Sequence, residues 1–363
     1  MASGRRLGII GVGFGAQVHA PAFRSEGWDI VALCSRDGSK ARAAADKLGV
    51  AHADTDPFRL IARGDIDAVS IAVPPRAHRD LVLAAAAAGK HILCEKPFAM
   101  SAEEAAEMKT AVERAGITAM VAHEFRYAPQ RAHIKALLDA GHIGAFRLCT
   151  VDLFLDRHAG KAPQRASWNA RQSEGGGALA GVGSHYIDGL RHWFGEIAAV
   201  SGWTGVFGAD LVDPASGAAV RSETDDSFSF TLFFANGGIA NMVMSLAVMP
   251  PRGASIAIMG DAGTLLATQP GPVPVEGGVV LASQDASPPV PVAMPAHLAP
   301  FSDPRDHRLM AFRMLVRDFN AGIAAGRSPS PNFDDGLRCQ LALDAIKQAA
   351  LRGRRVQLAA SPA

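Results

Sequence analysis

The stretch RRLGIIGVGFGAQVHAPAF, Arg5–Phe23, decides the architecture of the first part of this chain. A short apolar run predicts a strand, and the pattern G-x-G-x-x-A follows it at once from Gly11 to Ala16. The residues after the glycines predict a helix. This order is typical of a loop that binds a pyrophosphate with the free amide groups at the positive end of a helix.

Each small residue in the loop has a specific function in such a site. Gly11 permits the tight turn, Gly13 lets the backbone approach the pyrophosphate, and Ala16 allows the helix and the strand to pack closely. Phe14 and Gly15 lie within the same loop, so we assign them to the cofactor site as well. The alternative is a glycine-rich turn without a ligand; the strand–loop–helix context favours the binding loop.

The segments that follow alternate between strand and helix patterns. The expected strands are Ile30–Cys34, Ala68–Val73 and His91–Cys94, and the expected helices are Ser39–Leu48 and His78–Ala88. Alternation of this kind predicts a parallel sheet with right-handed crossovers. The fold class is therefore α/β, with an N-terminal Rossmann dinucleotide-binding domain over residues 1–122.

The end of the second strand bears on the choice of cofactor. Sites for NAD usually place an acid there to bind the ribose 2′-hydroxyl. Here the strand ends in Cys34 and continues with Ser35, Arg36 and Asp37. A hydroxyl and a guanidinium suit a 2′-phosphate, so we favour NADP(H). NAD(H) stays open, because a shift of one residue in the turn would aim Asp37 at the ribose.

A later strand runs into the sequence Glu95-Lys96-Pro97. Proline restricts the preceding residue to an extended conformation, and this places Lys96 at the carboxyl end of the sheet, where such folds bind ligands. A lysine there can stabilise negative charge that develops on a substrate oxygen. We assign Pro74, His78, Glu95 and Lys96 to the cofactor site, and Lys96 also to catalysis.

Several further motifs occur in a fixed order along the chain. They are GVGFGAQVHAPAF, HILCEKPFAM, HEFRYAP at 123–129, GGGALAGVGSHYIDGLRHWFG from Gly175, GDAGTL at 260–265 and PNFDDGLRCQLALDAIKQAA near the end. In this order the chain resembles the glucose–fructose oxidoreductase, inositol dehydrogenase and rhizopine-catabolism (Gfo/Idh/MocA) family. The resemblance implies an NAD(P)-dependent oxidoreductase that acts on CH–OH groups.

The resemblance also implies the second half of the fold. Residues 123–363 are expected to form an α+β domain with a large, open, mostly antiparallel sheet and a helix near 333–352. Asn236-Gly237-Gly238 predicts a hairpin between two of its strands. Exposed sheet faces rich in Ala, Val and Met are commonly covered by dimerisation, so we expect a homodimer or homotetramer that pairs through this sheet.

The family's catalytic pair carries over to Lys96 and His185. An imidazole suits the transfer of a hydroxyl proton while hydride leaves the carbon. The family's acid four residues before the histidine falls on Gly181, so that acid is missing. Three consequences fit this change: a bulkier substrate fills the gap, another acid such as Glu174 or Asp152 moves in, or catalysis is impaired. We favour the first, because the rest of the expected site is intact.

Four residues are candidates for substrate binding: His123, Arg126, Trp168 and Asp188. Asp188 lies three residues after His185 and could orient its imidazole, or it could pair with His192 one turn further on. Trp168 suits stacking against a sugar ring. For Trp168 a packing function on a loop explains the residue equally well.

Composition limits the remaining functions. Lys plus Arg is 36 and Asp plus Glu is 35, a net charge of +1, which indicates no nucleic-acid or membrane partner. The four cysteines form no paired motif, and we expect a reducing cytoplasm and no metal site. The predicted function is hydride transfer between a nicotinamide and a sugar, cyclitol or similar polyol. Alternatives are a bulkier diol or ketone substrate, or a cofactor-binding protein with little turnover.

Overall fold

The computed structural model of the chain describes residues 4–159, 164–208, 210–271, 278–284 and 287–358. Contacts divide the chain into two units. Unit 1 comprises Met1–Glu124 and Asp303–Gln340, and unit 2 comprises Phe125–Ser302 and Leu341–Ala363. The boundary expected between 122 and 123 stays a proposal about folding domains. The contacts group the chain differently, because the segment Asp303–Gln340 joins the first unit.

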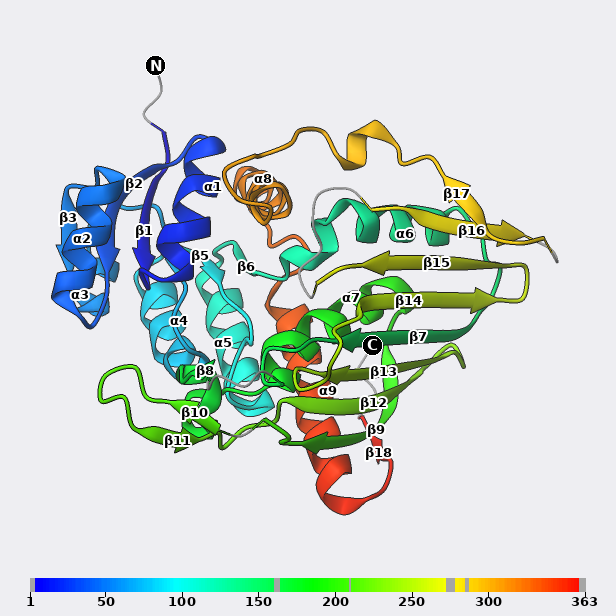
Figure 1. Ribbon diagram of the computed structural model, residues 1–363. Helices are drawn as coiled ribbons and strands as arrows, with labels where there is room; N and C mark the ends of the chain where they lie inside the picture. Colours follow the sequence, from blue (N-terminus) through cyan, green and yellow to red (C-terminus); the bar gives the residue numbers. More distant parts are fainter. Residues whose placement is uncertain (1–3, 160–163, 209, 272–277, 285–286, 359–363) are drawn as a thin grey trace. The chain divides into compact units, whose positions relative to one another are not determined.

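Unit 1 contains a six-stranded parallel sheet with the order β3-β2-β1-β4-β5-β6 (Figure 1). This is the strand order of the Rossmann fold, so the predicted fold class is confirmed. The strands are β1 (Arg6–Ile10), β2 (Asp29–Cys34), β3 (His52–Asp54), β4 (Ala68–Ile71), β5 (His91–Cys94) and β6 (Ala119–Val121).

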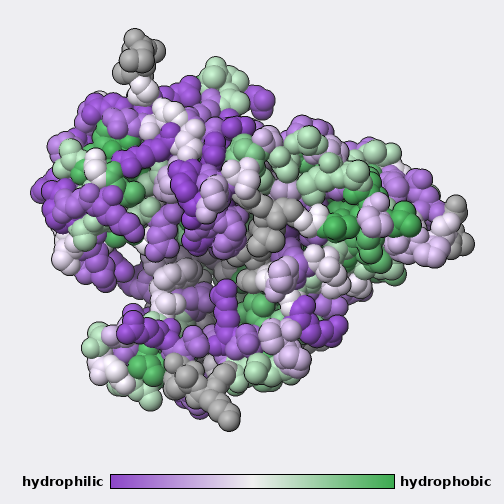
Figure 2. Space-filling model, turned by 45° about the horizontal axis from the view of Figure 1, so that its top comes forward, coloured by the Kyte–Doolittle hydropathy of each residue, from purple (hydrophilic) through white to green (hydrophobic). Residues whose placement is uncertain are grey.

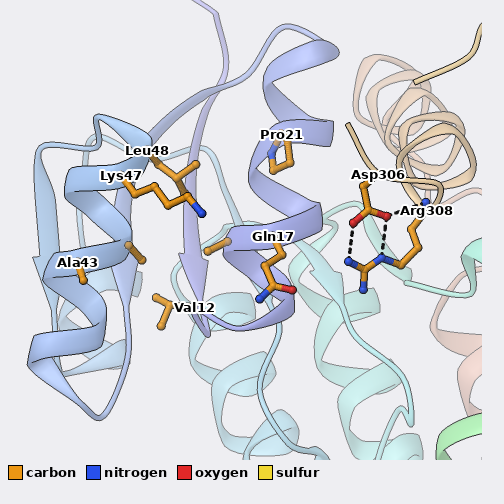
Figure 3. Close-up of a pocket in the computed structure, with 10 residues that line it drawn as sticks. Val12, Gln17, Pro21, Ala43, Lys47, Leu48, Asp306 and Arg308 are labelled. Atoms are coloured by element: carbon orange, nitrogen blue, oxygen red, sulfur yellow. Dashed lines mark hydrogen bonds and ion pairs between the residues drawn. The ribbon is translucent and has the colours of Figure 1, made fainter. Parts of the chain in front are cut away.

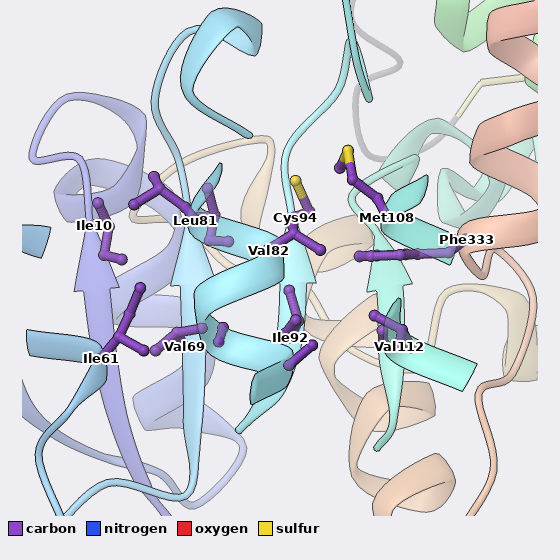
Figure 4. Packing of buried hydrophobic residues seen from close by; sticks show 14 of the residues in the cluster. Ile10, Ile61, Val69, Leu81, Val82, Ile92, Cys94, Met108, Val112 and Phe333 are labelled. Carbon is purple, nitrogen blue, oxygen red and sulfur yellow. The ribbon is translucent and has the colours of Figure 1, made fainter. Parts of the chain in front are cut away.

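Helices pack on the sheet through a continuous apolar cluster (Figure 4). Val69 on β4 and Ile92 on β5 are fully buried in it, because a parallel sheet has both faces covered. Phe333 in the C-terminal segment reaches the same cluster, with its ring 4.6 Å from that of Phe98. This contact is one physical reason why Asp303–Gln340 belongs to unit 1.

The helices of unit 1 have ordinary boundary signals. They are α1 (Ala20–Ser25), α2 (Gly38–Leu48), α3 (Pro57–Ile61), α4 (His78–Ala87), α5 (Ala102–Ala115) and α8 (Leu309–Ala325), with the short helix η2 at Pro75–Ala77. Ser101 caps α5 by accepting the amide of Glu104, and Gly116 ends the helix in the left-handed conformation. Helix α9 (Phe333–Arg352) runs from unit 1 into unit 2 and has the range expected for the final helix.

Several features of unit 1 were not predicted, including the helix α5 and the strand β6. Strand β3 has three residues, HAD, and the helix α3 after it has five, so neither has a periodicity that the sequence could reveal. The first helix also begins differently: a π-helical turn, η1 (Gly15–His19), precedes α1.

Unit 2 contains a nine-stranded sheet with the order β17-β16-β15-β14-β7-β13-β12-β9-β18. The pair β13 and β7 is parallel and the remaining pairs are antiparallel, which confirms the expected large, mostly antiparallel sheet. The strands are β7 (Phe146–Phe154), β9 (Ile197–Gly205), β12 (Ser227–Phe234), β13 (Ile239–Ser245), β14 (Gly253–Gly260), β15 (Gly263–Gln269), β16 (Val280–Gln284), β17 (Val290–Val292) and β18 (Val356–Gln357).

The predicted hairpin joins β12 to β13. Gly237 has a φ of 88°, and the amide of Gly238 donates to the Asn236 side chain at 3.0 Å, so the turn residues act as expected.

A smaller sheet is formed by β8 (Gln164–Arg165), β10 (Asp210–Val212) and β11 (Ala219–Arg221). The helical elements of unit 2 are α6 (Pro129–Asp139), α7 (Ser184–Phe194) and the short turns η4 (Trp168–Ala170), η5 (Gln172–Glu174), η6 (Leu179–Gly183) and η7 (Ala296–Leu298); η3 (Glu124–Tyr127) crosses the boundary between the units.

The surface is mixed in character. On the face drawn in Figure 2, hydrophilic residues dominate the left-hand part, and hydrophobic residues gather in a patch at the right. Within the described residues, no helix combines the length and the apolar character that crossing a bilayer requires.

Candidate active site

The glycine loop of unit 1 has the geometry that a dinucleotide requires. Gly11 has a φ of 105°, and a Cβ there would lie 2.0 Å from the carbonyl oxygen of Ala72, so only glycine fits. A Cβ on Gly13 would meet no atom of the described residues within 4 Å, which leaves open space above the loop. These two glycines therefore fit a bound pyrophosphate.

The close packing against the sheet falls on a different residue from the one predicted. A Cβ on Gly15 would lie 2.8 Å from the side chain of Ile9 and 3.2 Å from that of Ala72. Ala16, to which the sequence assigned this packing, instead lines a cavity beside the loop. The helix approaches the strand one residue earlier because η1 begins at Gly15.

The end of β2 uses its acid for local structure. One carboxylate oxygen of Asp37 accepts from the amides of Ser39 and Lys40 and from the Ser39 hydroxyl, and so caps α2. The Ser39 hydrogen bond, followed by the Lys40 amide, lowers the pKa of Asp37 to about 2. Arg36 is exposed at the same turn, and Ser35 is half-buried.

A buried hydrogen-bonded network connects η1 to β4 and to the end of β5, and the sequence did not predict it. His19 contacts the Ser70 hydroxyl through Nδ1 at 2.5 Å and the Glu95 carboxylate through Nε2 at 3.0 Å. The second oxygen of Glu95 accepts from the backbone amide of Lys96 at 3.1 Å. This hydrogen-bonded network therefore fixes the backbone at Lys96. The contact of Glu95 with the cofactor stays a prediction.

Burial and charge set the pKa of two carboxyl groups here. Burial alone would raise the pKa of Glu95, but the hydrogen bond and charge of His19 and the charge of Lys96 lower it. Glu124 has the opposite balance: burial, then the charge of Glu95, raises its pKa to about 8 despite Lys96 and Arg308. Glu124 is protonated near neutral pH, and sequence reasoning passed over it in favour of its neighbour His123.

His78 lies between two backbone segments. Its two ring nitrogens lie 2.8 and 3.0 Å from the carbonyl oxygens of Val73 and Phe98, and burial lowers its pKa. Contact of His78 with the cofactor stays a prediction. Pro74 lies in the extended turn between β4 and η2, so its assignment stays a prediction. His123 is 1% exposed and lies next to the last residue of the first segment of unit 1, and its contact with a substrate stays a prediction.

A cavity of about 620 Å³ lies beside the glycine loop (Figure 3). Helix α1, the loop and α2 supply most of its wall, and Asp306 and Arg308 of the C-terminal segment supply the rest. The Arg308 guanidinium lies 5.2 Å from the Phe14 ring centroid. Two parts of unit 1 that are far apart in sequence therefore meet at the loop.

In unit 2, His185 lies in the first turn of α7 and is 3% exposed. Its ring stacks on Phe125, with centroids 3.7 Å apart and planes at 6°. The buried guanidinium of Arg131 lies 5.4 Å from the Phe125 centroid and 4.4 Å from that of Tyr186. The stack holds the imidazole in one orientation.

Arg126 and Asp188 form a buried ion pair. Nε donates to one carboxylate oxygen of Asp188 at 2.6 Å and Nη2 to the other at 2.5 Å, and both side chains are almost fully buried. Nη1 also lies 3.4 Å from Nδ1 of His192. Asp188 thus takes Arg126 as a partner, an option that the sequence did not suggest. Contact of either residue with a substrate stays a prediction.

Gly181 lies in the π-helical turn η6 that precedes α7. Among the described residues, the neighbour within 4 Å of a Cβ here is Oδ1 of Asn169, at 3.3 Å. The same oxygen lies 3.2 Å from the amide of Gly177, which donates to it. An amide group, and not Glu174 or Asp152, therefore stands beside the position of the missing acid.

The approach to η6 is held from two sides. Asp225 accepts the amide of Leu179 at 2.7 Å, and burial raises the pKa of this carboxyl. Thr224 donates to the backbone oxygen of Asn169 at 2.7 Å.

Trp168, predicted to stack on a sugar, is 36% exposed at the start of η4, and its contact with a substrate stays a prediction. No group of three potential metal ligands occurs in the described part of the chain.

Comparisons with known proteins place this geometry in a family. Residues 5–123 match the family described as oxidoreductase family, NAD-binding Rossmann fold, and residues 132–266 match the GFO/IDH/MocA C-terminal domain. An uncharacterized oxidoreductase of Synechocystis sp. is 29% identical over 94% of this chain and 93% of its own. Levoglucosan dehydrogenase of Pseudarthrobacter phenanthrenivorans is 31% identical over 65% of this chain and 66% of its own.

Solved structures agree. Levoglucosan dehydrogenase in complex with NADH and L-sorbose is similar with a TM-score of 0.86 and 25% identity, covering 97% of this chain and 98% of that one. The apo form of levoglucosan dehydrogenase has a TM-score of 0.88 over 98% of each chain. The two family domains together span more than half of the sequence. The chain belongs to the Gfo/Idh/MocA family of NAD-binding oxidoreductases.

Proposed function

We propose that this protein is a dehydrogenase that transfers hydride between a nicotinamide cofactor and a secondary alcohol or ketone of a sugar, cyclitol or similar polyol. The observation that carries the proposal is the likeness, over 97% of the chain, to a levoglucosan dehydrogenase solved with NADH and L-sorbose. The glycine loop supports the cofactor part, because Gly11 allows the tight turn and Gly13 leaves open space that a pyrophosphate could occupy.

Two residues are proposed to carry the chemistry. The nicotinamide, when bound, supplies the hydride acceptor. His185 takes the hydroxyl proton on a ring nitrogen, and its stacking on Phe125 supports this function because a fixed ring loses little entropy on reaction. Lys96 steadies the charge on the substrate oxygen, and the Glu95 hydrogen bond to its backbone amide supports a fixed position.

The preference for NADP(H) is part of the proposal. Arg36 is exposed at the end of β2, and Asp37 is engaged in capping α2, which leaves a guanidinium and the Ser35 hydroxyl for a 2′-phosphate. One solved relative named above contains NADH, so the affinities of this protein for NADPH and NADH must be measured side by side. Fluorescence titration with NADPH and NADH should give the lower dissociation constant for NADPH. Arg36→Ala should remove the difference, and tighter binding of NADH would refute the preference.

The polyol part needs its own experiment. Turnover of a panel of sugars, cyclitols and ketones by the wild-type chain should identify a substrate. His185→Ala and Lys96→Ala should then each lower kcat by a factor on the order of 10² or more. An unchanged kcat in His185→Ala would refute the proton-transfer function. Cofactor binding without turnover of any panel member would favour the alternative of a binding protein with little activity.

The bulkier-substrate alternative loses support from Gly181. Oδ1 of Asn169 lies 3.3 Å from a Cβ placed on Gly181, so the Asn169 amide takes up part of the space beside the missing acid. We therefore place a sugar-sized substrate before a bulkier diol or ketone.

We also propose a homodimer or homotetramer that pairs through the large sheet. Trp203 and Val243 lie in one row across β9, β12 and β13, with Ser229 between them, and both are over 40% exposed. An apolar sheet face of this kind is commonly covered by a second subunit. Val243→Glu should lower the molar mass measured by light scattering. The four free, buried cysteines support a cytoplasmic location.

A further inference from the structure

The glycine loop has no positive charge of its own. The stretch from Gly11 to Gln17 contains neither lysine nor arginine, whereas the pyrophosphate of a dinucleotide has two negative charges. Backbone amides and the helix end supply partial charges that offset these only in part. A cation fixed beside the loop would complete the site.

Arg308 is such a cation. It lies about 300 residues after the loop, yet it lines the same cavity as Val12 and Ala16 (Figure 3). Its guanidinium lies 5.2 Å from the Phe14 ring centroid, a geometry in which the ring attracts the cation. Phe14 in turn contacts Phe312 of α8, with centroids 6.2 Å apart, so the loop and the start of α8 are packed together.

The side chain of Arg308 is held in one orientation. Nε donates to one oxygen of Asp306 at 2.9 Å and Nη2 to the other at 2.6 Å. This fork uses two of the five N–H groups, and no hydrogen bond between described residues uses Nη1. The guanidinium can therefore bind a second anion without losing Asp306.

We propose that Arg308 is a cofactor-binding residue that donates hydrogen bonds to the pyrophosphate of the dinucleotide from the side opposite the glycine loop. The proposal rests on the proposed function, since it assumes that unit 1 binds a dinucleotide. It extends the cofactor site to the C-terminal segment, which the loop motif does not reveal. Asp306 is a positioning residue for it.

The chain contains a matched control three residues away. Arg305 makes the same fork onto Asp303, at 2.7 and 2.5 Å, but its further hydrogen bond goes to the Ser25 hydroxyl on α1. Arg305 is not among the described residues that line the cavity.

The experiment is a fluorescence titration of the full chain with NADH, with ADP-ribose and adenosine as competitors. Arg308→Met should raise the dissociation constants of NADH and ADP-ribose about tenfold and leave that of adenosine unchanged, since adenosine lacks phosphate. Arg308→Lys should recover part of the loss. Arg305→Met should bind NADH as the wild type does.

Two outcomes would overturn the proposal: unchanged NADH binding by a folded Arg308→Met chain, or an equal loss in Arg305→Met. Thermal unfolding of each variant shows that it is folded, and Arg308→Lys replaces Arg308→Met if the latter is not. A wild-type chain that binds neither NADH nor NADPH would refute the proposed function itself, which is a different result.

Discussion

Two helices in this molecule, one in each unit, begin with a π-helical turn at a predicted functional segment. The first, η1, follows the glycine loop of unit 1, and the second, η6, precedes His185 in unit 2. Insertions of this kind often occur at functional sites. The loop before η1 is shaped by its own backbone, whereas η6 is held by side chains from other segments. The two regions therefore respond to mutation in different ways.

The largest loss of stability is expected at Gly11, which shapes the first region through its backbone conformation. Gly11→Ala places a Cβ 2.0 Å from the Ala72 carbonyl oxygen at a φ of 105°, so we expect the free energy of unfolding to fall by roughly 4 kcal/mol. Urea unfolding measures this. Gly27→Ala is the control: its φ is 89° and its Cβ meets no atom of the described residues, so about 1 kcal/mol should be lost. Equal losses in the two variants would contradict the contact argument.

The side-chain contacts of the helix that follows η6 are tested at Arg126, whose partner Asp188 lies on α7. Arg126→Met leaves Asp188 buried without its guanidinium partner, and unfolding free energy should fall by about 3 kcal/mol. Arg191→Met, which removes a half-exposed pair with Glu196, should cost less than about 1 kcal/mol. Urea midpoints of both variants decide this. A loss in Arg126→Met no larger than in Arg191→Met would show that the pair does not hold the region.

The charge state of Glu124 should make the free energy of unfolding depend on pH. Burial and the charge of Glu95 raise its pKa to about 8 in the folded chain, whereas an ordinary glutamate, as in the unfolded chain, has a pKa of 4.5. The folded state therefore binds the extra proton, and its stability falls as pH rises between these two values. Relative to Glu124→Gln, the wild type should lose on the order of 2 kcal/mol between about pH 6 and pH 7.5. Parallel urea profiles for the two chains would refute the raised pKa.

Gly13 separates binding from stability within the first region. A Cβ there meets no atom of the described residues, so Gly13→Ala should unfold at nearly the wild-type urea concentration. The methyl group enters the space that the pyrophosphate would occupy, and we expect the NADH dissociation constant to rise about tenfold. A loss of stability without weaker binding would mean that the open space above the loop is not the cofactor site.

The smallest effect is expected at Gly181. In Gly181→Ala the Cβ approaches Asn169 at 3.3 Å, and the side-chain amide can shift by a few tenths of an ångström, so stability should change by less than about 1 kcal/mol. Gly181→Asp should displace the Asn169 amide and lower kcat/KM for the native substrate. Faster turnover of that substrate by Gly181→Asp would contradict this expectation.

These cases show what the sequence determined. The parallel sheet and the glycine loop follow from local patterns, because each glycine acts through its own φ or its missing Cβ, and the predicted strands are continuous apolar runs. The long final helix was expected from the family resemblance, whereas the hairpin at Asn236 is local in the same sense. Local chemistry and tertiary structure agree at these positions, so pattern alone was sufficient.

The tertiary structure alone decided which distant side chains meet. His19 joins Ser70 and Glu95 below the loop, and Arg308 reaches Phe14 from the C-terminal segment. The partners of Arg126 and the neighbour of Gly181 are likewise far away in sequence. Such contacts depend on packing between elements and leave no periodic pattern in the chain, which is why the glycine loop could be predicted and the side chains around it could not.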